Sequence, residues 1–483
     1  MISGSVPPNE ARQCLHPTTL QLFLPTTVVP LMIELAPTTA PCQYLLRDEL
    51  ILRTSDICHS TGVRRKHQIA CNTGVEGCTS VVMDEETKEQ LLRANPLKGT
   101  NQIDVRGYNE RLVLQLIREH GSLTKAEATR ATGLSPNASS VIFRALESEG
   151  LIIRGDPIRG RVGQPSTPLR INPDAHHYVS LRVGRRSIDI AVVNFVGEIE
   201  SSRRMALPFP TPKVALEFFK SELGGVLRSA KKNRKSISGM SVAMPFELWS
   251  WTEEFGAPKE EMEAWRDFDI AAELQKIVPW KVLVENDGTA ACRAEQVFGS
   301  HTGKKDWVYF FVGTFIGGGI VLNGSVFPGS RRNSGGFGPM RVPEQSGGNR
   351  LVDHASLVVL ERSIAAEGGN PFAIYEEGSN WDDYEPLLSN WISNAALNLS
   401  HAIVSSLSVL DFDAAVIDGA FPSDVKKRLV SETRRQLSRA DLQGVHFLDV
   451  EEGQVGRRAR TISAAAAFVS ANYMIDQNTL HRN

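Results

Sequence analysis

The stretch "VLVENDGTAACRAE", residues 282–295, runs from a short β-rich segment into a helix that opens with small residues. Asn286 and Asp287 stand at the junction. An Asn–Asp pair in this position either caps the helix by accepting bonds from its first backbone N–H groups or offers donors and acceptors to neighbouring sugar hydroxyls. We predict that Asn286 and Asp287 bind a ligand and that Glu295 is structural. The stretch alone does not distinguish a catalytic base at Asp287 from a group that only grips a hydroxyl.

The surrounding residues, 172–483, alternate between strand and helix patterns. Buried strands are expected at 239–247, 281–286 and 414–419, and a β-prone hairpin rich in glycine at 307–327. A long amphipathic helix is expected at 388–411. This alternation predicts an α/β domain with two lobes about a cleft. In the loop 244–251, Trp249 and Trp251 either stack on a ligand ring or pack in the core.

Residues 107–171 read as a separate compact unit. Its first helix ends at Gly121. Thr124 then precedes a short helix, with Glu127 three residues on, which is a capping-box pattern. Ser135 and Pro136 begin the next helix, which reaches Gly150 and for which we expect a buried stripe of Val141, Ile142 and Leu146. Helix, short turn and helix in this order place a second helix in the major groove of DNA.

A basic hairpin follows these helices. Two β-branched runs flank a Gly/Pro-rich tip, and the segment carries Arg154, Arg159, Arg161 and Arg170 against the single acid Asp156, as in a DNA-binding wing. We therefore predict double-stranded DNA as a partner, although helix-turn-helix triplets also serve merely as packing units. The predicted contacts are Ser135, Asn137, Ser139, Ser140, Arg144, Arg154, Arg159 and Arg161.

The whole chain has 483 residues and a net charge of −2, which gives no global basic signal, so a nucleic-acid site must be local. No apolar run has the length of about 18 residues that a membrane helix needs. Five of the six cysteines precede residue 80, so the main body is expected to use no disulfides, as in a reducing cytoplasm. The spacing of Cys58, His59, His67, Cys71 and Cys78 lacks the usual zinc pairs.

The N-terminal residues 1–82 differ in composition from the rest, being rich in Pro, Thr and Cys without helical or strand periodicity. We interpret them as a disordered or non-native extension, with native translation beginning at Met83. The expected domains are therefore this extension, a winged helix-turn-helix domain at 83–171 and the α/β domain at 172–483.

Several motifs in order resemble the ROK family of repressors and sugar kinases over about residues 105–483. "GRVGQP" (160–165) resembles the family linker, "VENDGTAACRAE" (284–295) its sugar-binding motif, "VGTFIGGGIV" (312–321) its second phosphate loop, and "NSGGFGPM" (333–340) its zinc-binding segment. The resemblance implies an actin/hexokinase-like (ribonuclease H-like) fold preceded by a winged helix-turn-helix, as in the family's regulators.

Departures from the kinase pattern concern the phosphate site. Arg182 stands where family kinases have the Asp that helps place metal-bound phosphate, and a cation does not hold magnesium. We expect Arg182 to face solvent from a strand. Arg185 and Arg186 follow it and could draw in an anion. Asp418 replaces a family glycine near the nucleotide, which places a carboxylate unfavourably beside phosphates.

Departures also affect the zinc segment. Pro339 occupies the position of the family's zinc-binding His, and the segment 344–356 has no cysteine. Gly336 matches a sugar-contacting Glu, and a later Glu falls near Val352, so Asp353 is predicted as a substitute ligand residue. We expect no metal, no cofactor and no catalytic residues.

These observations predict a cytoplasmic transcriptional regulator, a repressor of carbohydrate-related genes, that acts as a homodimer or higher homo-oligomer and senses a sugar or sugar derivative. Two alternatives remain at this level. One is an ATP-dependent sugar kinase with a fused DNA-binding domain. The other is a constitutive DNA-binding protein whose α/β domain serves only dimerisation.

Overall fold

The computed structural model describes residues 102–157, 167–300, 304–376, 378–446 and 448–476, together with four short strands nearer the N-terminus. The chain divides into two compact units, Met1–Pro96 and Leu97–Asn483. In the first unit β1 (Phe23–Leu24) pairs with β2 (Thr27–Val28), and β3 (Cys71–Val75) with β4 (Cys78–Val81). Apart from these strands, residues 1–82, which we interpret as an extension, lie outside the described residues.

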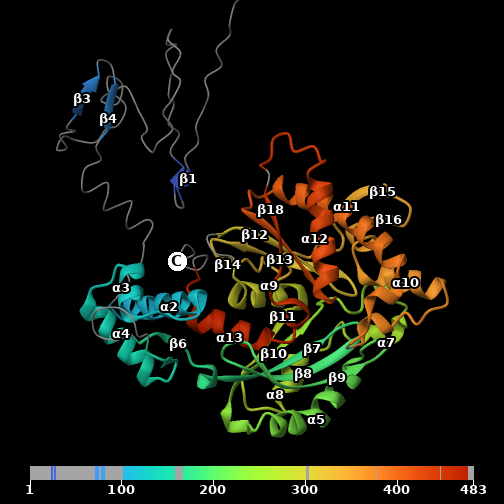
Figure 1. Cartoon of the computed structure of the whole chain (residues 1–483), viewed down its shortest axis with the longest axis horizontal. Helices are drawn as coiled ribbons and strands as arrows, with labels where there is room; N and C mark the ends of the chain where they lie inside the picture. Colours follow the sequence, from blue (N-terminus) through green and yellow to red (C-terminus); the bar gives the residue numbers. More distant parts are fainter. Residues whose placement is uncertain are drawn as a thin grey trace, which may run out of the picture. The chain divides into compact units, whose positions relative to one another are not determined.

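The second unit contains two five-stranded sheets with the same topology (Figure 1). In the first sheet β7 (His177–Val183), β8 (Ser187–Asn194) and β9 (Ile199–Ala206) form an antiparallel meander, and β10 (Ile237–Met244) and β11 (Val282–Asn286) continue it in parallel on the other side of β7. Strands β7, β8 and β10 are almost wholly buried because both faces of this sheet are covered.

The second sheet repeats this order. A meander of β12 (Trp307–Val312), β13 (Ile316–Leu322) and β14 (Ser325–Val326) is extended in parallel by β17 (Ala414–Gly419) and β18 (Asp449–Glu452). A small hairpin of β15 (Arg341–Gln345) and β16 (Gly348–Arg350) lies apart from it. Two similar sheets are the pattern of the predicted two-lobed actin/hexokinase-like fold.

Helices cover both sheets. Between them lie α9 (Asp287–Phe298) and α13 (Ser463–Tyr473), whose small residues allow close packing (Figure 1). The outer face of the first sheet packs on α5 (Pro212–Ser229) and α8 (Ile270–Gln275), with the short helices α6 (Thr252–Phe255) and α7 (Lys259–Glu263) nearby. The outer face of the second sheet packs on α10 (Leu357–Ala366), α11 (Leu387–Leu407) and α12 (Ser423–Leu437).

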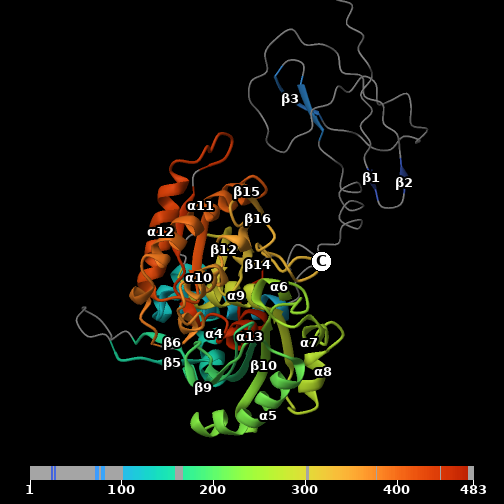
Figure 2. The same ribbon diagram turned by 90° about the vertical axis from the view of Figure 1, so that its right-hand side faces the viewer.

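The helix-turn-helix consists of α2 (Gln102–His120), α3 (Lys125–Thr132) and α4 (Pro136–Ser148). The predicted capping box is present, since Thr124 and Glu127 exchange side-chain and backbone bonds. Gly121 and Gly133 have positive φ and follow the ends of α2 and α3, and Gly121 is the residue predicted to end the first helix. The wing strands β5 (Ile152–Arg154) and β6 (Leu169–Ile171) pair antiparallel, and Figure 2 shows them as a ribbon that extends from the body.

The DNA-binding helices share one apolar cluster with the α/β domain. At the joint, the Arg118 guanidinium of α2 lies 5.2 Å from the ring of Phe195 and 5.5 Å from that of Phe298. Tyr473 of α13 bonds His176 at 2.6 Å, and the His176 ring also bonds the Ser238 hydroxyl. Within the described ranges, no helix combines the length and apolar character needed to cross a membrane.

Candidate functional site

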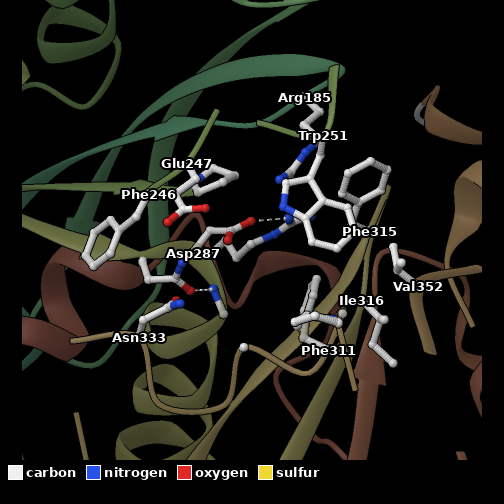
Figure 3. Close-up of a pocket in the computed structure, with 18 residues that line it drawn as sticks. Arg185, Phe246, Glu247, Trp251, Asp287, Phe311, Phe315, Ile316, Asn333 and Val352 are labelled. Carbon is white, nitrogen blue, oxygen red and sulfur yellow. Dashed lines mark hydrogen bonds and ion pairs between the residues drawn. The ribbon is translucent and has the colours of Figure 1, made fainter. Parts of the chain in front are cut away.

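A cavity of about 170 Å³ lies where β11 meets α9, next to the start of β13 (Figure 3). The stretch 282–295 therefore leads into it, as predicted. Two arginines, two carboxylates and two asparagines share this cavity with aromatic rings and backbone glycines. The side chains that line it include Arg185, Glu247, Trp251, Asn286, Asp287, Phe315, Asn333 and Arg460.

Asn286 both caps α9 and lines the cavity. Its Oδ1 accepts from the backbone N–H groups of Gly288 at 2.9 Å and Thr289 at 3.4 Å. The carbonyl oxygen is therefore engaged with the helix, and the amide NH₂ group is the part available to a ligand. The two functions weighed for this residue from sequence are thus compatible in one side chain.

Asp287 is the first residue of α9 and forms an ion pair with Arg460, 3.0 Å from Oδ2 to Nη1 (Figure 3). Burial lowers the pKa of Arg460 to about 10, with Arg182 also lowering it, so the guanidinium remains charged at neutral pH. The ion pair engages one oxygen of the Asp287 carboxylate, and a carboxylate has further lone pairs that can accept a bond from a ligand hydroxyl. Arg460 was not anticipated from the sequence.

Arg185 enters the cavity from the turn between β7 and β8. Its guanidinium carbon lies 4.2 Å from the centroid of the Phe315 ring and 5.9 Å from that of Phe255. Burial lowers the pKa of Arg185 to about 10, while Asp287 and Glu254 act to raise it. This residue also remains a cation at neutral pH.

Asp353 does not line the cavity, whereas its neighbour Val352 does. Both carboxylate oxygens of Asp353 bind Arg350, at 3.0 Å to Nε and 2.7 Å to Nη2. The prediction that Asp353 substitutes for a sugar-contacting Glu is therefore wrong in its geometry, because the side chain closes a local capping box with Arg350. Gly336 and Pro339 do border the cavity. His354 is buried and bonds the Gly348 carbonyl and the Asn394 side chain.

The aromatic residues of the loop 244–251 have separate positions. Trp251 lines the cavity, and its ring meets that of Phe315 edge-on at 6.0 Å. Trp249 instead packs against the core of the first lobe and carries Arg266 over its ring. Of the two tryptophans, Trp251 is the one placed to contact a bound ring.

Arg182 lies in a second, smaller cavity that also touches Arg460. The expectation that Arg182 faces solvent is therefore wrong. Its side chain is 13% exposed and forms an ion pair with Asp189, which lies directly opposite on β8. Arg186, in the turn between β7 and β8, is buried against Glu361. The region matched to the kinase metal anchor is therefore built from internal ion pairs.

Asp418 is fully buried at the end of β17. It accepts bonds from the backbone N–H groups of Gly419 and Gly456, at 2.9 and 2.8 Å, and pairs with Lys426 at 3.3 Å. Burial raises its pKa, and Lys426 counteracts this. The carboxylate is thus a structural anchor for the loop 453–456.

The glycines of the 312–321 loop have packing roles as well. A Cβ on Gly318 would lie 1.8 Å from the Tyr309 carbonyl oxygen, and one on Gly319 would lie 2.4 Å from Cβ of Cys292 on α9. Gly317 has open space and lines the cavity. Close packing of β13 against β12 at Gly318 and against α9 at Gly319 accounts for these two glycines without a phosphate.

The helix α4 presents one exposed face formed by Asn137, Ser140, Val141 and Arg144. Ser139 is 2% exposed, and its hydroxyl bonds Thr129 of α3 at 2.7 Å. The prediction that Ser139 lies on the exposed face is therefore wrong, as is that of a buried Val141, which is 43% exposed. The buried stripe is instead Ser139, Ile142, Phe143 and Leu146.

Ser135 caps α4 by accepting from the Ala138 N–H at 3.2 Å. In the wing, exposed Arg154 forms an ion pair with Glu147 of α4, 2.7 Å from Nε to Oε1. Arg159 and Arg161 lie outside the described residues. The structure thus brings Asn137, Ser140 and Arg144 onto one face and fixes Arg154 beside it.

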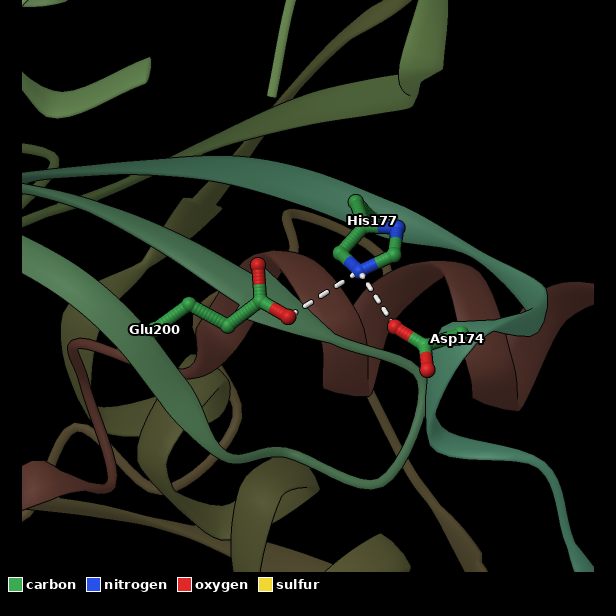
Figure 4. A group of neighbouring side chains, drawn as sticks. All are labelled: Asp174, His177 and Glu200. Carbon is green, nitrogen blue, oxygen red and sulfur yellow. Dashed lines mark hydrogen bonds and ion pairs between the residues drawn. The ribbon is translucent and has the colours of Figure 1, made fainter. Parts of the chain in front are cut away.

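Asp174, His177 and Glu200 have ligand atoms close enough to hold a metal ion (Figure 4). Lys232 Nζ already lies 3.5 Å from Asp174 and 3.7 Å from Glu200, and the His177 ring bonds Glu200 at 3.1 Å. An ammonium group in this place neutralises the carboxylates. The group is therefore best described as an ion-pair cluster near the interdomain joint.

The chain belongs to the ROK family, whose model matches residues 178–468, and a winged helix-turn-helix DNA-binding model matches residues 107–153. Among its relatives, the uncharacterized protein y4fQ of Sinorhizobium fredii is 22% identical over 366 residues, covering 74% of this chain and 89% of the relative. The xylose repressor of Bacillus subtilis is 22% identical over 254 residues, 52% of this chain and 65% of the relative.

The fold also matches a crystal structure of a ROK family transcriptional regulator, a homolog of the E. coli MLC protein. The TM-score is 0.54 at 22% identity, over 76% of this chain and 97% of that one. The predicted architecture, an actin/hexokinase-like domain preceded by a winged helix-turn-helix, is confirmed by these matches together with the two sheets described above.

Proposed function

We propose that this protein is a DNA-binding transcriptional repressor that responds to a sugar and does not transfer phosphate. The observation that carries the proposal is the junction of a winged helix-turn-helix with a ROK domain through a shared core. A repressor relative, named for xylose, supports the class but does not identify the sugar.

The exposed face of α4 would read the major groove. Asn137 can bond an adenine edge and Arg144 a guanine edge, and both side chains are exposed. The arginines of the wing would contact phosphates, which position the protein without reading sequence. A homodimer on a two-fold operator would place two such helices in successive major grooves.

Helix α13 offers a physical link between the two sites. It begins three residues after Arg460, which lines the cavity, and ends at Tyr473, which bonds His176 at the joint with α2. A ligand that bonds Asp287 and Arg460 differently in the open and closed lobes would shift the population of the two arrangements. Because α13 packs on α2, that shift would change the spacing of the DNA-binding domains.

Kinase chemistry is disfavoured by the residues present. Phosphoryl transfer needs a metal anchor, a phosphate cradle and an available base. Here Arg182 pairs with Asp189, Asp418 is committed to Lys426 and two backbone N–H groups, and Asp287 is paired with Arg460. Each of the three positions is occupied by an internal bond that a kinase would have to break.

The experiment has two stages. Genomic DNA fragments that bind the purified full-length protein are first selected and sequenced, which yields an operator. Its affinity is then measured by fluorescence anisotropy with and without a panel of pentoses, hexoses, sugar acids and sugar phosphates. We expect at least one of these to weaken operator binding. Equal affinity throughout would remove the sensing function and leave a constitutive DNA-binding protein.

A further inference from the structure

The Arg185 guanidinium lacks an anionic partner in the candidate site. Among the residues that the structure describes, none accepts a hydrogen bond from it, and no carboxylate lies within ion-pair distance. Its Nε is buried without a hydrogen-bond acceptor. Arg185 is half-buried, and the burial of its Nε without an acceptor is costly because the hydration of that N–H group is lost without replacement.

Two carboxylates whose charge acts on Arg185 are already engaged, and the cavity carboxylate of Glu247 is exposed and forms no ion pair with Arg185. Asp287 is bonded to Arg460 at 3.0 Å, and Glu254 is bonded to Arg350 at 3.2 Å. Asp287 and Glu254 are the two acidic groups whose charge acts on Arg185. Moving Asp287 to Arg185 would leave Arg460 without its carboxylate, and moving Glu254 would break its bond to Arg350, which would keep only Asp353.

The position of Arg185 is nevertheless fixed by aromatic rings. Phe315 lies under the guanidinium at 4.2 Å and Phe255 at 5.9 Å. Such contacts hold a planar cation by one face and leave its edge, which carries the N–H donors, free for an in-plane acceptor. Figure 3 shows Arg185 and Asp287 in the same cavity, with Trp251 and Phe315 close to the arginine.

The cavity thus combines two kinds of recognition group. The amide of Asn286 and the paired carboxylate of Asp287 suit hydroxyls, and Trp251 suits the apolar face of a ring. Arg185 suits a carboxylate or phosphate, which it can bind in a bidentate manner. A neutral sugar would satisfy the first set and leave Arg185 unpaired.

We propose that the effector is an anionic monosaccharide, with its hydroxyls on Asn286 and Asp287 and its carboxylate or phosphate on Arg185. This assignment rests on the proposed function, because it takes the cavity to be the effector site. The shared chemistry is a single acidic group on a sugar ring. Sugar acids and sugar phosphates both carry it, and the test separates them.

The test is a calorimetric titration of the full-length protein with matched sugars. Glucose is compared with glucuronate and glucose 6-phosphate, galactose with galacturonate and galactose 6-phosphate, and N-acetylglucosamine with its 6-phosphate. We expect at least one acidic form to bind about ten- to a hundredfold more tightly than its neutral parent, the range for a charge-assisted hydrogen bond. If the uronate binds more tightly than its parent, the acidic group is a carboxylate, and if the sugar phosphate does, it is a phosphate.

The variant Arg185→Gln should remove this preference while leaving neutral-sugar binding within roughly threefold, because only the charge-assisted bond is lost. Arg185→Lys keeps the charge and should retain part of the preference for the acidic sugar. This variant also controls for a loss of binding that is caused by misfolding. Arg203→Gln, on the exposed strand β9, is the matched control and should behave as wild type. Acidic sugars that bind no better than their parents, or a preference that survives Arg185→Gln, would overturn the proposal.

The two proposals fail in different ways. Operator binding that responds only to neutral sugars would keep the proposed function and remove the anionic effector. Arg185-dependent binding of an acidic sugar that never alters operator affinity would keep the anion site and remove the regulatory function. No binding by any sugar would remove both.

Discussion

The contacts of Asp418 indicate a structural role and not a catalytic one. It lies where the family resemblance places the nucleotide, yet it is buried against Lys426, Tyr309 and two backbone N–H groups. Removing one member of a buried ion pair leaves the other charge uncompensated. Asp418 is therefore expected to matter for folding.

We predict that Asp418→Asn lowers the free energy of unfolding by about 3 kcal/mol, measured by chemical denaturation. Asp424→Asn, exposed in the first turn of α12, is the control and should change stability little. A variant at Asp418 that is as stable as wild type would contradict the structural role.

We expect the titration of His176 to change the stability of the contact between the DNA-binding helices and the α/β domain. Burial lowers its pKa from the ordinary value of 6.5, and neighbouring His177 lowers it further. The His176 ring therefore binds a proton less readily in the folded state than in the unfolded state. The resulting contribution of neutral His176 to the free energy of unfolding is fully present above pH 6.5. It is lost as the pH falls through 6.5 towards the folded pKa.

The expected result is that the difference in melting temperature between wild type and His176→Gln narrows from pH 7.5 to pH 5.5, as seen by differential scanning calorimetry. Wild type loses the His176 contribution over this range, whereas Gln does not titrate. A difference that stays constant or widens on acidification would show that His176 is not held neutral.

At the scale of elements, α4 shows what the sequence could and could not predict. Its start, cap and end were predicted because Ser135, Pro136 and Gly150 are local signals. The buried face of α4 is predicted with Val141 in place of Phe143. Both residues neighbour Ile142, and the apolar pattern does not distinguish between them. Phe143, the larger apolar side chain, is the one buried.

The neighbouring serines of α4 give a matched pair. Ser139→Ala removes the buried hydroxyl bond to Thr129 and should cost about 1 kcal/mol of stability, with DNA affinity changed only through folding. Ser140→Ala, on the exposed face, should leave the melting temperature unchanged and weaken operator binding. Thermal melting and anisotropy on both variants check this, and the reverse pattern would place the DNA-reading face elsewhere.

The wing is an element whose function depends on charge more than on fold. Arg159 and Arg161 are expected to contact phosphates, in which case each alanine variant should weaken binding uniformly across DNA sequences. The slope of log K against log salt should flatten by about 1 for each lost contact. Anisotropy titrations at several salt concentrations measure it, and an unchanged slope would show that the wing does not touch phosphate.

The candidate site was predictable only in part, for a physical reason. Asn286 and Asp287 follow directly from a strand-to-helix junction. The Arg182–Asp189 pair could have been found from the tight turn at 184–186, which sets the two residues opposite each other on β7 and β8. Arg460 is 173 residues from Asp287, and only the packing of α13 beside α9 brings them together, so no local pattern reveals it.

At the scale of the whole molecule, the DNA-binding helices share one apolar cluster with the helices that lie between the two sheets. Helices α9 and α13 lie side by side between the sheets (Figure 1). The first carries Asp287 and the second follows Arg460 and reaches the joint at Tyr473. A ligand at the Asp287–Arg460 pair would therefore contact α9 and the segment that leads into α13, which connects the cavity to the DNA-binding helices.

The most direct test of this account is one anisotropy titration of an operator fragment, run with wild type and Asp287→Asn, with and without the tightest-binding sugar. We predict that the sugar weakens operator binding by wild type at least tenfold, within the usual range of allosteric coupling of about 1–3 kcal/mol. Asp287→Asn should bind the operator equally well but lose the response. Operator affinity that the sugar leaves unchanged in wild type, or a response that persists in Asp287→Asn, would contradict the account.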